Sequence, residues 1–165
     1  MIDYIPTKDE IEVARLIAER RNSLNFGGSN IPGGEYLNQQ ERLLQHFQGA
    51  LAEIAVSRIY NLCWSGCGKG SNGCLDVGNC LQVRSVADSK RGLLCRQKDV
   101  SEHPCVLVQV LESNQCILVG WEHLSRVKTE GWVLDRYSHK PAWVLPRDHL
   151  RSLESFNPLY WRKRR

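Results

Sequence analysis

We expect this chain to form an α+β domain with N-terminal helices followed by a mixed β-sheet. Three observations lead to that expectation. The first part of the chain holds two stretches that join a helix-capping pattern to apolar residues at helical spacing. From about residue 75 the pattern changes to short β-type runs between turn-forming residues. The chain has 165 residues, 42% of them hydrophobic and 24% charged, which suffices for one domain with a buried core.

The first helix is predicted from a cap and an apolar pattern. Thr7-x-x-Glu10 matches the capping box, in which a Thr or Ser side chain and a Glu three residues later satisfy backbone N–H groups reciprocally. Apolar residues at roughly helical spacing follow over residues 11–24. The Gly-rich segment 26–34 then ends the helix.

The second helix is the longest predicted element. Asn38-x-x-Glu41 offers its cap, and residues 41–62 contain no proline and one internal glycine. A broad apolar face predicts that this helix is largely buried, with Glu53 in a narrow polar stripe opposite that face. A carboxylate there is either paired or metal-bound at the margin of the core, or solvated on an exposed strip. The helix alone leaves both interpretations open.

Five short runs are predicted to be strands, because Gly, Asn, Ser, Pro and charged residues bound them. They are residues 81–86, 93–95, 106–111, 117–121 and 142–145. The third run is almost continuously apolar, which is typical of a central strand covered on both faces. Residues 112–115 are expected to form a hairpin turn, and a short helix is expected near residues 147–153.

A single domain is predicted, because neither an internal repeat nor a low-complexity linker is present. Residues 1–35 form the N-terminal helix with its Gly-rich turn, residues 36–155 the core, and residues 156–165 a basic tail. Residues 1–60 carry six Lys or Arg against eight acids, and residues 61–165 carry sixteen against ten. This favours contact with a polyanion such as DNA or another nucleic acid, while a merely solvated tail is the alternative. The candidate contacts are Arg126, Lys128, Arg162, Lys163, Arg164 and Arg165.

A membrane or secretory location is not expected. No apolar run approaches the roughly 20 residues of a membrane span, and the first ten residues carry acids where a signal peptide would be basic and then apolar. The seven cysteines are an odd number in a chain without an export signal, which favours reduced thiols in a cytoplasm over a disulfide framework.

One segment combines an aspartate with a polar and a cationic side chain. Asp76 comes just before a predicted strand, and Gln82 and Arg84 lie two residues apart, so both project from the same face of that strand. The aspartate supplies a hard oxygen ligand for a divalent cation, Gln82 can add a carbonyl oxygen, and Arg84 can stabilise charge on a phosphoryl group. An amphipathic strand with its polar face in water is the alternative interpretation.

A second candidate site is formed by cysteines. Four of them fall within eighteen residues and are interspersed with glycines, an arrangement that allows a loop to fold around zinc. They are Cys63, Cys67, Cys74 and Cys80. The spacing lacks the paired C-x2-C knuckles of a zinc ribbon, so ordinary reduced cysteines are the favoured interpretation. Cys95, Cys105 and Cys116 lie in predicted strands, where cysteine commonly packs as a small buried hydrophobe.

An ordered set of segments resembles a family of small phage and prophage proteins that are similar to the PD-(D/E)XK nuclease superfamily. The segments are GALAEIAV, LDVGNCLQVRSV, LLCRQKD, PCVLVQVL, ILVGW and KPAWVLPRDHL, which span residues 49–150. The resemblance implies a restriction-endonuclease-like core. It also implies that Glu53 is the helix glutamate, Asp76 the aspartate of the turn, and Gln82 and Arg84 the (D/E)-x-K pair.

Two positions depart from the superfamily pattern. Glutamine in place of the acidic residue also occurs in active members of the superfamily. Arginine in place of lysine matters more, because arginine stays charged and cannot act as a base. With Gln82 neutral, Glu53 and Asp76 are the anionic ligands that remain, so one Mg²⁺ (or Mn²⁺) with several retained waters is expected instead of two ions.

Three functions remain open at this point. The first is a metal-dependent phosphodiester hydrolase of the DNA-endonuclease type, acting in the cytoplasm of a bacterial host, with Asp76, Glu53 and Gln82 as metal ligands and Arg84 as the transition-state cation. The second is a catalytically inactive protein of the same fold that binds nucleic acid or a host protein, in which Asp76 and Arg84 would form an ion pair. The third is a zinc-dependent interaction module. The oligomeric state is not indicated by any of these features.

Overall fold

Two helices begin the fold, and each starts at the cap that the sequence predicts. The computed structural model describes residues 1–24, 38–66, 75–97, 99, 102–134, 142–158 and 160. Helix α1 (Lys8–Leu24) begins where the Thr7 hydroxyl accepts the backbone N–H of Glu10 at 3.2 Å and the Glu10 carboxylate accepts the N–H of Thr7 at 2.9 Å. Helix α2 (Gln39–Ile59) begins with the corresponding reciprocal pair at Asn38. Both capping boxes are therefore confirmed.

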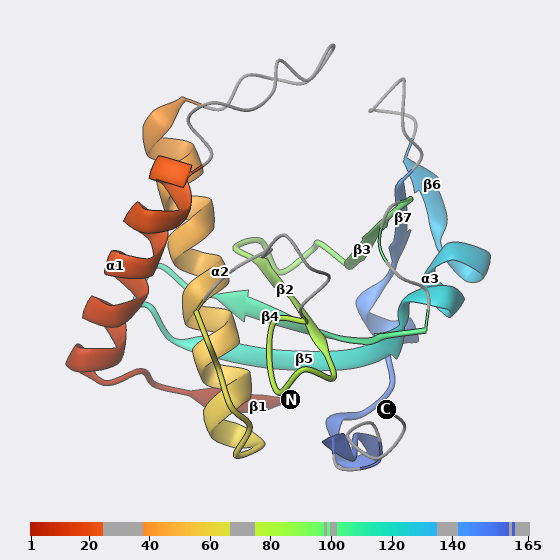
Figure 1. Ribbon diagram of the computed structural model, residues 1–165. Helices are drawn as coiled ribbons and strands as arrows, with labels where there is room; N and C mark the ends of the chain where they lie inside the picture. Colours follow the sequence, from red (N-terminus) through yellow and green to blue (C-terminus); the bar gives the residue numbers. More distant parts are fainter. Residues whose placement is uncertain are drawn as a thin grey trace.

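The main sheet has four strands in the order β1, β5, β4, β2 (Figure 1). These strands are β1 (Ile2–Tyr4), β5 (Cys116–His123), β4 (Pro104–Val110) and β2 (Gln82–Val86). Strand β2 pairs parallel to β4, and the other pairs are antiparallel. Every residue of β4 is buried, which confirms the prediction of a central strand. Helix α2 packs on one face of this sheet, and α1 packs on α2.

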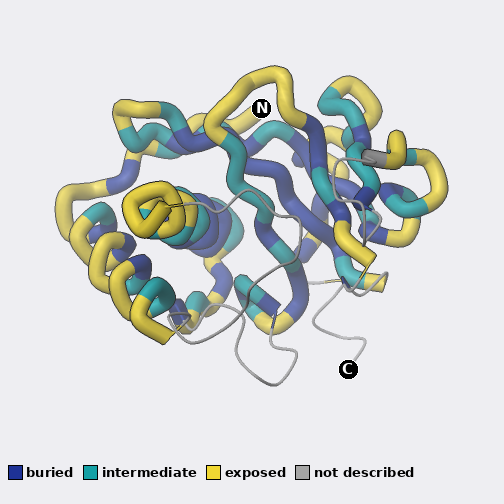
Figure 2. The backbone as a smooth tube through the Cα atoms, turned by 90° about the horizontal axis from the view of Figure 1, so that it is seen from above, coloured by how far each residue is buried: buried dark blue, intermediate teal, exposed yellow. Residues whose placement is uncertain are grey.

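A second, three-stranded sheet covers the opposite face. Its order is β3 (Leu93–Arg96), β7 (Ala142–Leu145) and β6 (Trp132–Leu134), and the short helix α3 (Leu124–Glu130) packs beside it. The fully buried core on this side is one cluster, composed of Leu93, Cys95, Cys105, Leu107, Leu124, Val127 and Leu145. Figure 2 shows burial concentrated on α2 and the central strands, while the outer side of α1 is exposed. The prediction of an α+β fold is thus confirmed.

The differences from the predicted elements are local. Strand β1, helix α3 and strand β6 were not predicted, because each is seven residues or shorter and lacks a clear periodic pattern. The helix expected near residues 147–153 is instead two short 3₁₀ turns, Arg147–His149 and Leu153–Ser155. The β4–β5 hairpin turn forms where it was predicted, with Asn114 at a φ of 68°. Segment 26–34 and the tail residues 161–165 lie outside the described residues.

Strand β2 positions the candidate site, because it is the edge strand of the main sheet and lies between the helices and the second sheet (Figure 1). Val83 belongs to the core under α2, whereas Val86 packs with the core under the second sheet. Since side chains alternate along a strand, Gln82 and Arg84 share the face of Val86 and point away from α2. None of the helices among the described residues is long and apolar enough to cross a membrane.

Candidate functional site

Asp76 lies beside the free edge of β2. A tight turn after Asp76 places it there. Val77 and Leu81 form an isolated β-bridge, and Gly78 and Asn79 between them have φ values of 61° and 52°. These positive φ values suit glycine and asparagine and are strained for most other residues. One carboxylate oxygen of Asp76 accepts the backbone N–H of Val83 at 2.8 Å. The turn therefore fixes the aspartate against the first residues of the strand that carries Gln82 and Arg84.

Glu53 lies on α2 and is buried, with 7% of its surface exposed. Its two oxygens accept both terminal nitrogens of Arg21 from α1, at 3.1 and 2.6 Å, and the indole N–H of Trp64 at 2.7 Å. Burial raises the pKa of the Glu53 carboxyl, and the nearby Asp76 adds to that rise, against the opposing effect of Arg21. The interpretation of Glu53 as a solvated glutamate is therefore wrong. It is a buried carboxylate that is paired within the chain.

Arg84 lies on the other face of β2 and has its own buried partner. Its Nη2 donates to Asp99 at 2.7 Å, and the same carboxylate oxygen accepts the backbone N–H of Arg96 at 2.9 Å. Burial disfavours the charged guanidinium, yet the surrounding groups, Asp99 and Asp76 among them, outweigh it and raise the pKa of Arg84. The ion pair expected between Asp76 and Arg84 in a binding protein is thus replaced by Arg84–Asp99, because Asp76 is used at the strand edge.

Helix α3 supports the Arg84–Asp99 pair through Lys128. The Lys128 ammonium donates to the backbone carbonyls of Gln97 at 3.2 Å and of Asp99 at 2.5 Å. These contacts fix the turn that carries the Asp99 carboxylate. Lys128 was predicted to contact nucleic acid, and the structure uses it to position Asp99 and, through it, Arg84.

The four predicted residues converge on the edge of β2. Asp76 interacts electrostatically with Glu53 on the helix side and with Arg84 on the opposite side. Three carboxylates (Glu53, Asp76 and Asp99) face two guanidiniums (Arg21 and Arg84), which leaves one net negative charge in the cluster. A cluster of this sign attracts a cation.

The side-chain oxygens near Asp76 decide whether the expected Mg²⁺ can bind there. Among the described residues, no group of three or more His, Cys, Asp or Glu side chains is arranged to hold a metal ion. The Glu53 oxygens are already engaged by Arg21 and Trp64. In the described part of the chain, however, the second oxygen of Asp76 has no recorded partner, and the Gln82 Oε1 is buried without one. These are the oxygens that the described residues offer to an ion that keeps most of its waters, as Mg²⁺ commonly does.

The cysteines divide into two groups. Cys95, Cys105 and Cys116 are buried, as predicted, and burial raises their pKa values to about 11, 12 and 12. These thiols are therefore neutral at physiological pH and unsuited to act as nucleophiles. Of the four zinc candidates, Cys63 is exposed and Cys80 is buried, whereas Cys67 and Cys74 lie outside the described residues.

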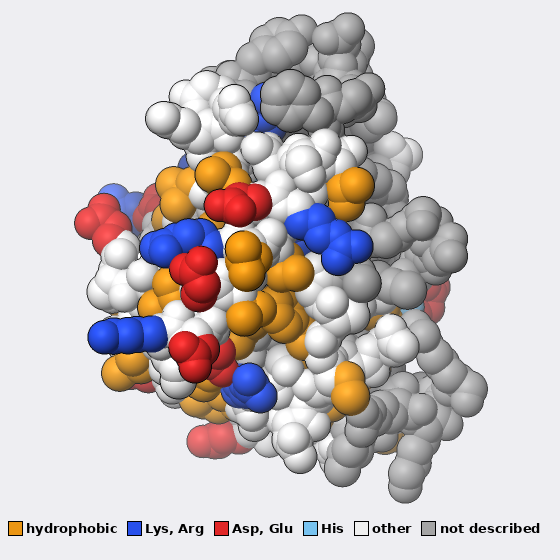
Figure 3. Space-filling model, turned by 60° about the vertical axis from the view of Figure 1, so that its left-hand side comes forward, with side chains coloured by type: hydrophobic (Ala, Val, Ile, Leu, Met, Phe, Trp, Pro, Cys, Tyr) orange, Lys and Arg blue, Asp and Glu red, His pale blue; other side chains and the backbone are white. Residues whose placement is uncertain are grey.

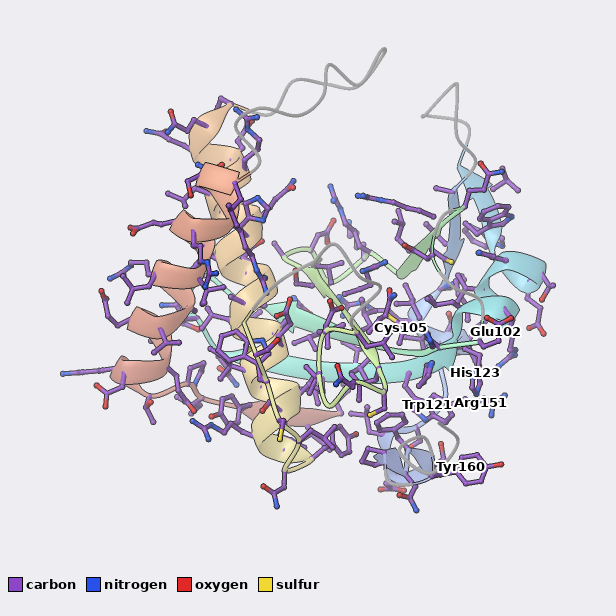
Figure 4. The ribbon with its side chains drawn as sticks, in the orientation of Figure 1. Glu102, Cys105, Trp121, His123, Arg151 and Tyr160 are labelled. Atoms are coloured by element: carbon purple, nitrogen blue, oxygen red, sulfur yellow. The ribbon has the colours of Figure 1, made fainter. Side chains whose placement is uncertain are left out.

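Arg126, the other predicted nucleic-acid contact that the structure describes, belongs to an internal network. Its Nη1 donates to Glu122 at 2.5 Å and its Nε to Glu130 at 2.8 Å. Glu122 is fully buried and also accepts from Arg151, whose guanidinium carbon lies 5.2 Å from the ring centre of Trp121. Figure 4 shows Trp121, His123 and Arg151 together at the end of β5. Arg162, Lys163, Arg164 and Arg165 lie outside the described residues.

Comparisons of the chain with protein-family models, with curated proteins and with solved structures gave no match.

Proposed function

We propose that this chain is a metal-dependent phosphodiester hydrolase of the DNA-endonuclease type, with a restriction-endonuclease-like core and an origin in a phage or prophage. The observation that carries the proposal is the position of Asp76 at the edge of β2, where its carboxylate interacts with Glu53 on one face and Arg84 on the other. Residues from a helix, a turn and a strand thus meet at one place, in the order that the sequence resemblance implies.

Each residue has a role that follows from its contacts. Asp76 and Gln82 would hold Mg²⁺, which when bound polarises a phosphoryl oxygen and lowers the pKa of its water. Arg84 is held by Asp99 through Nη2, and among the described residues no partner is seen for its other N–H groups, which would donate to a phosphate oxygen. Glu53, fixed by Arg21 and Trp64, contributes negative charge beside Asp76 without being a direct ligand. Arg84 cannot remove a proton from water, so its role is to stabilise charge.

The test is a cleavage assay at low salt with Mg²⁺, Mn²⁺ or EDTA on linear duplex, single-stranded, nicked and branched DNA. The D76N variant keeps an oxygen for the Val83 N–H but loses the charge, so we expect cleavage to fall by about 100-fold or more. The matched control is E12Q, which makes the same change at an exposed residue of α1. Equal activity of D76N and wild type, or absence of cutting on every substrate, would refute the proposal.

A second candidate is a catalytically inactive protein of this fold that binds nucleic acid or a host protein. The observation that favours it is that both Glu53 and Arg84 already have buried ion-pair partners, Arg21 and Asp99. Thermal melts separate the two candidates. A metal site predicts that Mn²⁺ raises the melting temperature of the wild type and leaves D76N unchanged. Folded protein that shifts DNA in a gel, without cleavage and without stabilisation by metal, supports the binding protein.

A further inference from the structure

A basic turn follows β2 directly. The backbone N–H of Arg91 donates to the carbonyl of Asp88 at 3.2 Å, and the Asp88 carboxylate accepts the N–H of Lys90 at 2.8 Å, which together close the turn. Both Lys90 and Arg91 are exposed. The chain therefore leaves the strand of Gln82 and Arg84 and at once presents two cations to solvent.

Arg147, two residues after the end of β7, fixes this turn. Its Nε donates to the carbonyl of Arg91 at 2.9 Å, its Nη2 to the carbonyl of Asp88 at 3.0 Å, and its Nη1 to the side-chain oxygen of Gln109 at 3.0 Å. The amide of Gln109 in turn donates to the carbonyl of Ala87 at 3.2 Å. All three acceptors of Arg147 are neutral oxygens. Its positive charge is therefore added to those of Lys90 and Arg91, with the Asp88 carboxylate as the opposing charge nearby.

The strand register places this turn next to the candidate site. Arg84 pairs with Leu107 and Val86 pairs with Gln109, so Arg84 and Gln109 lie on the same face of the sheet. Two residues along a strand correspond to about 7 Å. Arg147, bound to Gln109, thus lies on the face of Arg84 and roughly one such step further along the strand.

We propose that the turn of residues 88–91, fixed by Arg147, binds the phosphodiester backbone of a nucleic-acid strand next to the phosphate held at Asp76 and Arg84. This inference rests on the proposed function and extends it from one phosphate to its neighbours. A row of cations along one strand suits a ligand whose charges repeat along a chain. The face of α1 does not, because acidic and basic side chains are interspersed there with exposed Val13 and Leu16 (Figure 3).

The test measures binding apart from cleavage. Labelled duplex DNA, single-stranded DNA and RNA of one sequence are titrated with protein in EDTA, and fluorescence anisotropy gives the Kd at several salt concentrations. For the K90A/R91A double variant we expect a Kd at least about tenfold higher on the preferred strand type. The slope of log Kd against log salt concentration should also fall, by an amount that corresponds to up to about two fewer counterions released on binding. The matched control is K8A/R20A, which removes the same charge from exposed positions of α1 and should change the Kd by less than about threefold.

The two double variants distinguish a local binding surface from a general effect of net charge. Equal losses in K90A/R91A and K8A/R20A would show that only net charge matters and would overturn the proposal, as would unchanged binding by K90A/R91A. Selective loss of binding together with absence of cleavage would leave this surface standing and refute the hydrolase. Normal cleavage with unaffected binding would do the reverse. Circular-dichroism melts check that both double variants remain folded, which is expected because all four side chains are exposed.

Discussion

The ion pair between Arg21 and Glu53 is the interaction on which the helix side of the site depends. About nine-tenths of each side chain is withdrawn from water, and the pair is bidentate. A buried pair of this kind adds little net stability compared with apolar residues, but breaking it is expensive because one charge stays buried without compensation. Arg21 thus opposes the effect of burial on the pKa of the Glu53 carboxyl and holds that carboxyl in place.

We therefore expect R21A to lower the free energy of unfolding by about 3–5 kcal/mol. E53Q in the R21A background should recover part of that loss, because a neutral amide is cheaper to bury than an unpaired carboxylate. Urea unfolding of wild type, both single variants and the double variant gives the coupling energy. The control is R15A, whose partner Glu12 is exposed and whose effect should stay within about 0.5 kcal/mol. Equal effects of R21A and R15A would show that the pair is not structurally important.

Single residues also mark the limit of prediction from the sequence. Glu53, Asp76, Gln82 and Arg84 could be singled out because their type and spacing suggest chemistry. Asp99 and Glu122 could not, since a lone acid in a strand or loop gives no sign that an arginine distant in sequence will be its partner. The hydrogen bonds from Lys128 to backbone carbonyls could not be predicted for the same reason. Burial and pairing depend on the tertiary structure, and the local pattern does not encode them.

At the scale of elements, Glu10 joins three of them. Its carboxylate accepts the hydroxyl of Tyr4 from β1 at 2.9 and 2.8 Å, the N–H of Thr7 at the start of α1, and the Nε of Arg58 from α2 at 2.7 Å. Burial pushes the pKa of Glu10 upward, but these hydrogen bonds outweigh it and hold the pKa below the ordinary value. Burial, and to a lesser extent the hydrogen bond to Glu10, raise the pKa of Tyr4 to about 12.

This network predicts a pH dependence of stability. Because the pKa of Glu10 is lower in the folded chain than in the unfolded chain, its contribution is fully present above the unfolded pKa of about 4.5 and is lost as the pH falls through the folded value. We expect the stability of the E10Q variant to fall less between neutral and acid pH than that of the wild type, because a glutamine at this position does not titrate. Urea midpoints measured from about pH 6 to about pH 3 test this. E12Q, on the solvent side of α1, is the control and should follow the wild type, and an E10Q curve parallel to the wild type would contradict the prediction.

Elements differed in how well they could be predicted, for physical reasons. The starts of α1 and α2 were found because a capping box is a local interaction written in four residues. Strand β4 was found because burial on both faces demands a continuous apolar run. Strands β1 and β6 have three residues each, and they form because β5 and β7 offer them an edge. Because such strands depend on their neighbours, the local sequence does not predict them.

At the scale of the whole molecule, charge and architecture divide the chain in the same way. Residues 1–60, which include both long helices, carry a net charge of −2, and residues 61–165, which include β2 and the second sheet, carry +6. Four described bases of this second part, Arg84, Lys90, Arg91 and Arg147, lie on β2, on the turn after it and on the segment after β7. A long polyanion should therefore approach the sheet side and avoid the helices.

Hydrogen exchange tests this orientation across the whole chain at once. With saturating DNA in EDTA, we expect slower amide exchange in peptides covering residues 82–99 and 145–153, because the bound backbone would shield the turn and the segment that fixes it. Peptides covering residues 8–24 should exchange as in the free protein, since the outer face of α1 carries mixed charge. Raising the salt to about 0.5 M should remove the protection, because contacts with phosphates weaken as counterions compete. Protection confined to α1 and α2 would place the DNA on the opposite side and would refute the assignment of the polyanion to the sheet.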